Sequence, residues 1–373
     1  MRVLITGAQG FMGKNLQLHL RERKDVQVVC FGRDQQIVQL PDLMKGVDFV
    51  FHLAGINRPQ DPGEFTVGNP GLTTSLCAAV MQEAETAGKT IPVVYASSTQ
   101  AALDNPYGRS KREAEEALRA CGSGVRAHVF RLPNVFGKWC KPNYNSVVAT
   151  FCHNIARGLP IQVNDPAAPI TLAYVDDVLD RFVRLMDGAD AAPGADGFET
   201  VSPLYATTVG DLARQVEAFR DSRDTLMTER VGTGLVRALH ATYVSYLPVE
   251  TFAYEVPQHA DARGVFVEML KTPDCGQFSF FTAHPGVTRG GHYHHSKTEK
   301  FLVVRGQARF RFRHMQTGQV HELETSGERP QIVETVPGWT HDITNIGREE
   351  MVVMLWANEV FDRDRPDTYA CPL

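Results

Sequence analysis

Two groups of side chains in this sequence could carry out chemistry, and they lie far apart along the chain. In the first group, Tyr107 and Lys111 stand four positions apart in NPYGRSK, shortly after the pair Ser97 and Ser98. Residues i and i+4 are neighbours on a helix, so the Lys111 ammonium would lie close to the Tyr107 hydroxyl and lower its pKa. A tyrosine primed in this way can donate or accept a proton near neutral pH. Asn105 and Pro106 have the residue types of a helix N-cap and a first helical position, which predicts that this helix begins there.

A glycine-rich loop precedes the tyrosine motif. Gly7, Gly10 and Gly13 stand in GAQGFMG, a GxxGxxG spacing that directly follows the apolar segment RVLIT. A Cβ atom would block the tight turn and the close approach of a pyrophosphate to the N-terminus of the following helix. The spacing therefore predicts a dinucleotide site in which Phe11 and Met12 open the helix.

Arg33 indicates which dinucleotide is bound. It follows the second apolar segment in the order Phe31-Gly32-Arg33, where an acidic side chain would bind ribose hydroxyls. An arginine at this place suits a 2′-phosphate, so NADPH is favoured over NADH. Asp34 is adjacent, and a merely solvated Arg33 is the alternative.

The second chemical group is rich in histidine. Eight of the 13 histidines fall at or after His259, and three of them stand in HYHH at 292–295. His292 and His294 would face the same side of a strand, with Glu299 and His341 supplied by other segments. Three imidazoles and a carboxylate suit Zn²⁺, Mn²⁺ or Fe²⁺, with Zn²⁺ as the first choice. A β-bulge would present His295 in place of His294, and packed histidines without a metal are the other alternative.

Two kinds of elements must position these groups. Strand-like segments at 2–6, 27–31, 48–53, 92–96 and 127–131 alternate with helical patterns at 11–23, 71–87 and 107–121. This order predicts an α/β Rossmann-type, doubly wound parallel sheet. After about residue 257, short strand segments follow one another at 276–283, 298–305, 307–314, 331–336 and 351–358, which predicts an all-β sandwich or barrel. We expect an NADP-binding domain over 1–250 and a metal-binding β domain over 251–373.

Composition excludes several classes of protein. The net charge is −5, from 38 Lys plus Arg and 43 Asp plus Glu, which gives a nucleic-acid-binding role no support. The apolar stretches are shorter than the roughly 18 residues of a membrane-spanning helix, and the N-terminus has no secretory signal. Seven cysteines without a CxxC motif indicate reduced thiols and a cytoplasmic location.

The first part of the chain resembles an extended short-chain dehydrogenase/reductase of the nucleotide-sugar branch. The resemblance rests on GAQGFMG, HLAG at 52–55, ASS at 96–98, YGRSK and RLPNVFG at 131–137. It implies that Ser98, rather than Ser97, hydrogen-bonds the substrate carbonyl, that Tyr107 passes the proton, and that Lys111 holds the ribose. It also implies that Leu53 and Ala54 line the cofactor. Asn134 stands where relatives contact the sugar nucleotide, although a structural role is the alternative.

The last part of the chain resembles a cupin. Gly286, His292, His294, Glu299 and Gly306 fit the first cupin motif, and Gly338, His341 and Asn345 in PGWTHDITN fit the second. Upstream, DARGVFVE at 261–268 is similar to the opening of the dehydrorhamnose-type sugar epimerases. That similarity implies a sugar nucleotide with Arg263 near its phosphates, and a structural ion pair is the alternative for Arg263.

Over its full length the chain resembles the bifunctional capsular-polysaccharide enzymes of the CapF type. The resemblance implies a homodimer and a UDP-2-acetamido-2,6-dideoxy-4-keto-hexose substrate. The cupin would epimerise C3 and the reductase would then reduce C4 with NADPH, giving the L-talose sugar on the route to UDP-N-acetyl-L-fucosamine. Epimerisation must come first, because the C3 hydrogen is acidic only while C4 is a ketone. Two alternatives remain: a cupin that serves only as a metal-stabilised oligomerisation module, and a reductase half that is a non-catalytic NADP-binding scaffold.

Overall fold

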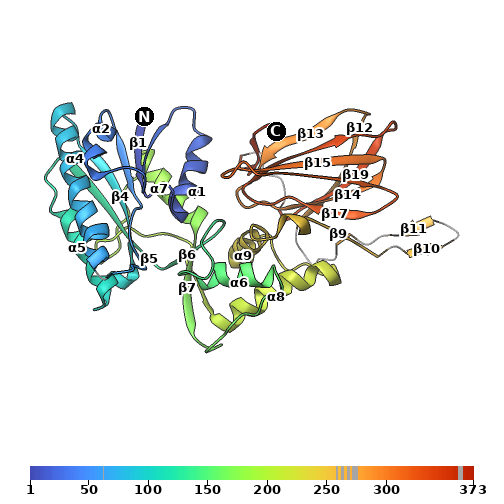
Figure 1. Ribbon diagram of the computed structural model, residues 1–373, viewed down its shortest axis with the longest axis horizontal. Coiled ribbons are helices and arrows are strands. Elements are labelled where there is room, and N and C mark those ends of the chain that lie inside the picture. Colours follow the sequence, from blue (N-terminus) through green and yellow to red (C-terminus); the bar gives the residue numbers. More distant parts are fainter. Residues whose placement is uncertain (62, 258, 262–263, 267–268, 271–275, 360–363) are drawn as a thin grey trace. The chain divides into compact units, whose positions relative to one another are not determined.

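The computed structural model describes residues 1–61, 63–257, 259–261, 264–266, 269–270, 276–359 and 364–373 (Figure 1). The chain packs as two compact units, each made of two stretches. The first unit contains Met1–Phe136 and Ile170–Ala206, and the second contains Gly137–Pro169 and Thr207–Leu373. The expected domain boundary near residue 250 stays a prediction. Within the described residues, no helix combines the length and the apolar character needed to cross a lipid bilayer.

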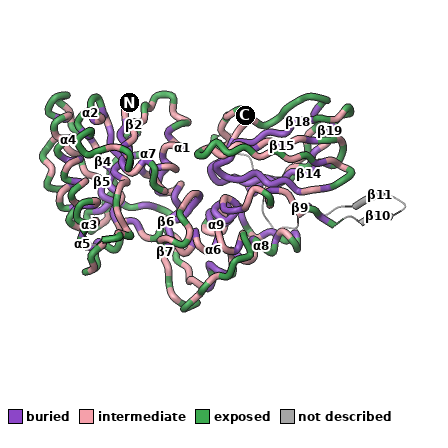
Figure 2. The backbone as a smooth tube through the Cα atoms, viewed as in Figure 1, coloured by how far each residue is buried: buried purple, intermediate pink, exposed green. Residues whose placement is uncertain are grey.

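The first unit is built on a five-stranded parallel sheet in the order β2-β1-β3-β4-β5. Its strands are β1 (Arg2–Thr6), β2 (Gln27–Phe31), β3 (Phe49–His52), β4 (Ile91–Ser98) and β5 (Val125–Leu132). The central strands are apolar because both of their faces are covered, and Figure 2 shows them as buried. The predicted strands therefore agree with the structure to within a few residues.

Helices cover both faces of this sheet, which confirms the predicted doubly wound fold. The helices are α1 (Phe11–Arg21), α2 (Leu40–Met44), α3 (Gly63–Thr66), α4 (Leu72–Ala87), α5 (Pro106–Arg119) and α7 (Val175–Met186), with short turns η1 (Ile37–Gln39), η2 (Val67–Gly71) and η3 (Thr99–Ala102). In Figure 1, α1 and α7 lie on one face of the sheet, and α2, α4 and α5 lie on the other. Leu76 and Val80 of α4 pack with Leu118 of α5 in the core on that second face.

The strand order determines where the cofactor loop lies. The chain moves outward from β1 to β2 and then returns to the other side of β1 with β3. The carboxyl ends of β1 and β3 are therefore adjacent at a point where the strand order reverses, which is where open α/β sheets bind ligands. Beyond this sheet, β6 (Asn134–Phe136), β7 (Pro169–Tyr174) and β8 (Tyr205–Thr208) form a small three-stranded sheet.

The second unit contains a β-sandwich of two five-stranded sheets, which confirms the predicted all-β fold of the last third. One sheet has the order β12-β19-β14-β17-β9 and the other β16-β15-β18-β13-β20. The bounds of these strands are β9 (Ala253–Glu255), β12 (Gln277–Ala283), β13 (Thr288–Tyr293), β14 (Glu299–Arg305), β15 (Gln307–His314), β16 (Val320–Ser326), β17 (Gln331–Glu334), β18 (Trp339–Asn345), β19 (Met351–Ala357) and β20 (Tyr369–Ala370). A separate hairpin pairs β10 (His259–Asp261) with β11 (Gly264–Phe266). Phe301 on β14 meets Phe310 on β15 at a ring distance of 5.7 Å, so aromatic side chains fill the space between the two sheets.

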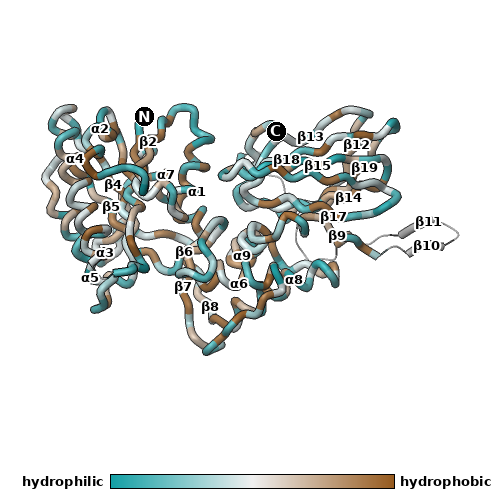
Figure 3. The backbone as a smooth tube through the Cα atoms, viewed as in Figure 1, coloured by the Kyte–Doolittle hydropathy of each residue, from teal (hydrophilic) through white to brown (hydrophobic). Residues whose placement is uncertain are grey.

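The strand segments predicted from the sequence did not include β16 or β18, and β13 was expected only as the strand of His292 and His294, without bounds. These strands are rich in polar residues, and Figure 3 shows polar and apolar stretches interleaved along the sandwich. All seven residues of β18, WTHDITN, are nevertheless buried. A polar strand is stable in the interior when its side chains find partners, and Arg311 on β15 supplies one for Asp342 at 2.5 Å.

Three helices pack within the second unit as well. They are α6 (Val147–Ile155), α8 (Val209–Thr225) and α9 (Gly234–Val244), and the turn η4 (Val249–Thr251) leads from them to β9. Arg223 of α8 joins Glu334 of β17 at 3.1 Å, and Glu334 also accepts from Lys300 of β14 at 2.7 Å. The helices are therefore tied to the sandwich by buried charges.

Candidate active site and candidate metal centre

The glycine loop has the geometry that the sequence predicts for a dinucleotide site. Gly7 adopts a left-handed φ of +67°, and a Cβ there would lie 2.7 Å from the Ala54 nitrogen. A Cβ on Gly13 would lie 2.2 Å from the Gly7 carbonyl oxygen, so both glycines are needed for the close packing of this loop. Gly10 is the N-cap of α1 and offers no side chain, which leaves the first amides of the helix open to an anion.

The other predicted cofactor residues lie around this loop. Phe11 and Met12 are the first two residues of α1, and Leu53 and Ala54 follow the end of β3. Arg33 is exposed, and its backbone N–H donates to Gln9 Oε1 of the glycine loop at 2.9 Å. The turn that carries Arg33 is thus joined to the dinucleotide loop. The preference of Arg33 for a 2′-phosphate stays a prediction.

Ser98, Tyr107 and Lys111 come together at the carboxyl end of the sheet. Ser98 is the last residue of β4 and hydrogen-bonds the Tyr107 hydroxyl. Helix α5 begins at Pro106, and Asn105 caps it by accepting the Gly108 N–H at 2.7 Å, as predicted. Lys111, one turn further along α5, is buried and donates to the Ala96 carbonyl at 2.8 Å.

The protonation states of this group differ from the expectation. Burial raises the pKa of Tyr107 above its usual value, although the hydrogen bond with Ser98 opposes the rise. Burial also lowers the pKa of Lys111 to about 7, with Glu115 opposing the fall. The expected lowering of the Tyr107 pKa by Lys111 is therefore wrong for this structure. Desolvation penalises the charged forms of both groups, so the lysine is itself only partly protonated near neutral pH.

The neighbouring serine has a different environment. Ser97 is buried and donates to Glu115, whose carboxylate also holds Arg131 at 2.7 Å. Arg131 in turn lies over the ring of Phe198 at 3.9 Å. Ser97 therefore belongs to a structural ion-pair group, and of the two serines Ser98 is the one beside Tyr107.

A buried polar chain supports the active-site helix, and the motif analysis did not identify it. His52 contacts Thr6 Oγ1 at 2.7 Å and Thr73 Oγ1 at 2.8 Å, and burial lowers the pKa of His52 to about 3, so this histidine is neutral. Thr73 donates to the backbone of Asn69, and the Asn69 side chain reaches Ser110 Oγ at 2.8 Å. HLAG pointed to His52 as a family motif, but no local signal marks Asn69.

Of the two residues predicted to contact the substrate, Asn134 and Arg263, the structure describes Asn134. Asn134 is exposed on β6, and its side-chain amide donates to the Thr171 carbonyl at 3.3 Å. It is available at the surface, and its role toward a sugar nucleotide stays a prediction. Arg263 lies outside the described residues.

The four predicted metal ligands converge in the β-sandwich. His292 lies on β13, His294 directly follows that strand, Glu299 begins β14 and His341 lies on β18. Their ligand atoms all lie within 4.8 Å of one another. Glu299 Oε2 is 3.0 Å from His294 Nε2 and 3.5 Å from His341 Nε2, and the second distance is too long for a good hydrogen bond.

The charges of this cluster suit a divalent cation. Burial and the neighbouring His341 and His294 lower the pKa of His292 to about 3. Burial opposes ionisation of Glu299, yet the facing His294 and His341 hold its carboxyl pKa well below the usual range. Neutral imidazoles and an ionised carboxylate are the forms that bind a metal, so the residues present fit such an ion. That a metal binds here stays a prediction.

Of the two adjacent histidines, His294 is the one that joins this cluster. A register irregularity between Gly290 and His292 shifts the pairing of β13 with β18, and His292 pairs opposite His341. His295 points elsewhere and packs against Tyr293 and Tyr369. The bulge therefore does not bring His295 into the ligand set.

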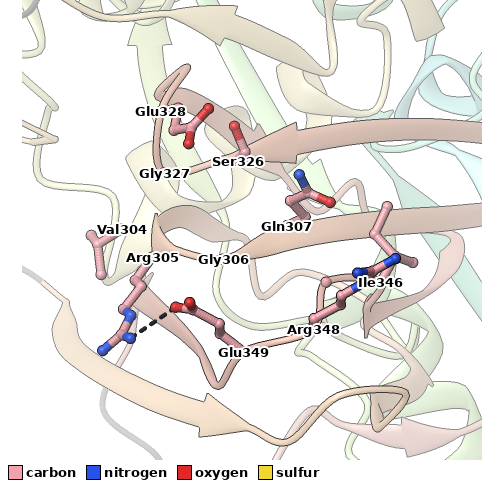
Figure 4. Close-up of a pocket in the computed structure, with 11 residues that line it drawn as sticks. Val304, Arg305, Gly306, Gln307, Ser326, Gly327, Glu328, Ile346, Arg348 and Glu349 are labelled. Atoms are coloured by element: carbon pink, nitrogen blue, oxygen red, sulfur yellow. Dashed lines mark hydrogen bonds and ion pairs between the residues drawn. The ribbon is translucent and has the colours of Figure 1, made fainter.

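A separate pocket of about 630 Å³ lies at the other end of the sandwich strands (Figure 4). Glu299 begins β14 and Arg305 ends it, which separates the pocket from the ligand cluster by about 20 Å along the strand. Arg305 and Glu349 form an ion pair of 2.9 Å at its rim. None of the predicted site residues lines this pocket.

Comparison with protein families gives two matches along the chain. Residues 3–198 match the NAD dependent epimerase/dehydratase family, and residues 259–369 match the polysaccharide biosynthesis C-terminal domain. The first match covers the glycine loop and the Ser98, Tyr107 and Lys111 group. The second covers all four predicted metal ligands.

Some individual relatives match the chain over its full length, and others match about three fifths of it. A protein of Pseudomonas aeruginosa named UDP-2-acetamido-2,6-beta-L-arabino-hexul-4-ose reductase is 60% identical over 100% of this chain and 98% of its own. Among solved structures, the capsular polysaccharide assembling protein CapF from Staphylococcus aureus is 38% identical, with a TM-score of 0.67 and 100% of both chains covered. A UDP-glucose 4-epimerase of Thermotoga maritima, 22% identical with a TM-score of 0.51, covers 59% of this chain and 82% of its own and shares the fold alone.

Proposed function

Because the chain belongs to the NAD dependent epimerase/dehydratase family and carries a polysaccharide biosynthesis C-terminal domain, we propose that it is a bifunctional nucleotide-sugar enzyme. Its cupin epimerises C3 of a UDP-2-acetamido-2,6-dideoxy-4-keto-hexose, and its reductase unit then reduces the C4 ketone. The product is UDP-2-acetamido-2,6-dideoxy-L-talose, a precursor for capsule or O-antigen synthesis by way of UDP-N-acetyl-L-fucosamine. The Pseudomonas aeruginosa relative, a UDP-2-acetamido-2,6-beta-L-arabino-hexul-4-ose reductase by name and 60% identical, supports this substrate class.

The observation that carries the reductase assignment is the group of Ser98, Tyr107 and Lys111 at the carboxyl end of the sheet that bears the glycine loop. NADPH supplies a hydride to C4 of the ketone when it is bound. The Ser98 hydroxyl polarises the carbonyl oxygen, and Tyr107 donates its proton to the alkoxide that forms, which completes the secondary alcohol. Lys111, held by the Ala96 carbonyl at 2.8 Å, helps to restore the Tyr107 proton and to orient the cofactor ribose.

The epimerase assignment depends on the order of the chemistry. A base can remove the C3 hydrogen only while the C4 ketone can accept the charge as an enolate. His292, His294, Glu299 and His341 would hold a divalent cation, with Zn²⁺ as the first choice, and the cation would stabilise that negative charge as a Lewis acid. His292 is only half-buried, which supports access to the cluster from outside the sandwich.

The cofactor and the assembly are also parts of the proposal. Arg33 at the end of β2 supports NADPH as the preferred donor, because a guanidinium can bind a 2′-phosphate. Leu53 and Ala54 would line the nicotinamide side of the site, and Asn134 the sugar nucleotide. The resemblance to enzymes of the CapF type supports a cytoplasmic homodimer, which a mass measurement by light scattering at working concentration checks.

One experiment tests both activities. The full chain is incubated in D₂O with UDP-2-acetamido-2,6-dideoxy-4-keto-hexoses, with and without NADPH, and the products are identified by NMR. We expect deuterium at C3 without NADPH, and reduction at C4 when NADPH is added.

Tyr107→Phe should abolish NADPH oxidation and leave the C3 exchange intact. Reduction without C3 exchange would leave a reductase whose cupin only stabilises or oligomerises the protein. NADPH oxidation unchanged by Tyr107→Phe would refute the proposed reductase site.

A further inference from the structure

The C-terminal residues 366–372, here called the C-terminal strap, contact β13, β18 and the turn that precedes Glu299. The strap contains β20, which pairs with β13 so that Ala370 lies opposite His292. The Cys371 N–H donates to the Gly291 carbonyl at 2.7 Å, and Thr340, next to His341, donates to the Cys371 carbonyl. The two strands that hold His292 and His341 are thereby fastened to one short segment.

The Asp367 carboxylate holds the turn between the other two ligands. It accepts three consecutive backbone N–H groups, from His295 at 2.8 Å, Ser296 at 3.0 Å and Lys297 at 2.7 Å. The Ser296 hydroxyl adds a fourth hydrogen bond at 3.1 Å. These are three of the four residues between His294 and Glu299, so their conformation affects the separation of those two predicted ligands.

The Asp367 backbone fixes the orientation of a ligand directly. Its carbonyl oxygen lies 2.6 Å from His294 Nδ1. A carbonyl can only accept, so Nδ1 donates to it, and Nε2 is the ring nitrogen that faces Glu299 and His341. Metal-binding histidines characteristically donate their second nitrogen in this way, which holds the ring and raises its basicity as a ligand.

Asp367 occupies this place in an unfavourable backbone conformation. Its φ is +38°, in the left-handed region that residues with a Cβ rarely adopt. Such a conformation persists only where surrounding contacts over-determine it, and it is concentrated at functional sites. The Lys297 ammonium also binds the residues on both sides of Asp367, because it donates to the Pro366 carbonyl at 3.0 Å and to Thr368 Oγ1.

We propose that the C-terminal strap is a positioning element for the metal centre, with Asp367 as the residue that holds His294 and the turn before Glu299 in their ligating geometry. The proposal rests on the proposed function, in which the four ligands bind a divalent cation. Asp367 is outside the predicted ligand set, and it acts through the residues of that set. Without its carboxylate, the 295–297 turn would be free to rearrange, and the ligands would lose part of their preorganisation.

The test compares full-length variants by their affinity for Zn²⁺, measured by competition with a chromophoric chelator. Asp367→Gly removes all four carboxylate hydrogen bonds and accommodates the positive φ, and it keeps the carbonyl that faces His294. Loss of a residue that orients metal ligands typically weakens affinity about 10- to 100-fold, and we expect that range here. Asp367→Asn keeps one acceptor oxygen and should give a smaller loss. Glu324→Gln, which changes an exposed carboxylate on β16 outside the strap, is the control and should bind Zn²⁺ as the wild type does.

Two readouts separate positioning from general stability. Co²⁺ bound in place of Zn²⁺ should show altered visible bands in Asp367→Gly, because the ligand geometry changes. The rise in melting temperature that Zn²⁺ produces should also shrink, whereas a purely structural residue would lower the melting temperature equally with and without metal. A wild-type Zn²⁺ affinity in both Asp367 variants would overturn the proposal. If Asp367→Gly does not fold, the Zn²⁺ affinity of Asp367→Asn alone is the test. A wild-type protein that takes up no metal would instead refute the metal centre itself, and the positioning role with it.

Discussion

Ser97 and Ser98 are neighbours in the sequence and have unrelated environments in the structure. Successive residues of a strand point to opposite faces, so one serine turns toward Glu115 and the other toward Tyr107. The difference separates a structural hydroxyl from a candidate catalytic one.

Substitution by alanine should therefore lower activity at Ser98 and stability at Ser97. We expect Ser98→Ala to lower kcat for ketone reduction about 10²- to 10³-fold, as for other donors that stabilise a developing oxyanion. Ser97→Ala should retain most activity and lose about 1–3 kcal/mol of stability, because Glu115 loses a buried partner. Steady-state kinetics and urea unfolding of both variants check this. Equal losses of kcat in the two variants would contradict the assignment of Ser98.

Lys111 should make stability depend on pH. Its pKa is about 7 in the folded chain because of burial, and a lysine in the unfolded chain keeps its proton to about pH 10. Between these values the unfolded state binds more protons, so the free energy of unfolding rises with pH, by at most about 1.4 kcal/mol per unit. In Lys111→Met this contribution disappears.

Urea unfolding of the cofactor-free protein from pH 7 to 9 measures the difference between wild type and Lys111→Met. We expect the wild type to gain stability relative to the variant as the pH rises. A difference that stays constant over this range would mean that Lys111 keeps its proton in the folded protein.

At the level of elements, α8 is joined to the sandwich by a buried charge group. Lys300 donates to Glu334 at 2.7 Å and to the Tyr254 hydroxyl at 2.6 Å, and Arg223 of α8 completes the group. Burial disfavours the ionised carboxyl, yet Lys300 and Arg223 lower the pKa of Glu334 to about 2. The charges are thus matched to each other, and removal of one leaves the others unpaired in the interior.

Lys300→Met should destabilise the protein strongly. Breaking a buried ion pair from one side typically costs about 3–5 kcal/mol, because the remaining charge is left without its partner. Urea unfolding at neutral pH measures the loss, and adding Glu334→Leu to the same chain should recover part of it. A surface pair provides the control, since Arg305→Met breaks only the exposed contact with Glu349 and should cost under about 1 kcal/mol. Similar values for the two single variants would contradict the importance of the buried group.

At the level of the whole molecule, the two candidate centres lie in different compact units. The glycine loop and Tyr107 belong to the first unit, and the four predicted ligands and the C-terminal strap belong to the second. Because the two candidate centres lie in separate units, we expect that the two proposed activities can be lost one at a time.

Removal of the metal should therefore separate the two activities. After treatment with a chelator, we expect deuterium exchange at C3 to fall to the rate without enzyme, while binding of NADPH is retained. Zn²⁺ should restore the exchange, and the melting temperature of the second unit should rise with it. NMR, fluorescence titration of NADPH and metal analysis of the same samples measure these effects. Exchange that continues in protein shown to be free of metal would leave the ion a structural role.

The sequence alone was enough for the features that depend on local chemistry. The glycine spacing, the Asn105 cap, the Pro106 start of α5 and the alternation of strands with helices are short-range signals, so the fold class and most elements of the first sheet were predicted correctly. The residues predicted for the two candidate centres were chosen from their types, spacing and family resemblance, and the structure brings them close together. Polar strands such as β18 were missed because their burial depends on partners from distant segments.

Only the tertiary structure decided which of two adjacent residues faces a site and what charge it carries. His294 rather than His295 joins the predicted metal ligands, since β13 has an irregular register and Asp367, 73 residues further along the chain, holds the His294 ring. Burial raises the pKa of Tyr107, where the sequence spacing to Lys111 indicated a fall. Residue types determine which chemical groups a chain can bring to a site. Desolvation and the direction of each side chain depend on neighbours that are remote in sequence, and those are present only once the chain is folded.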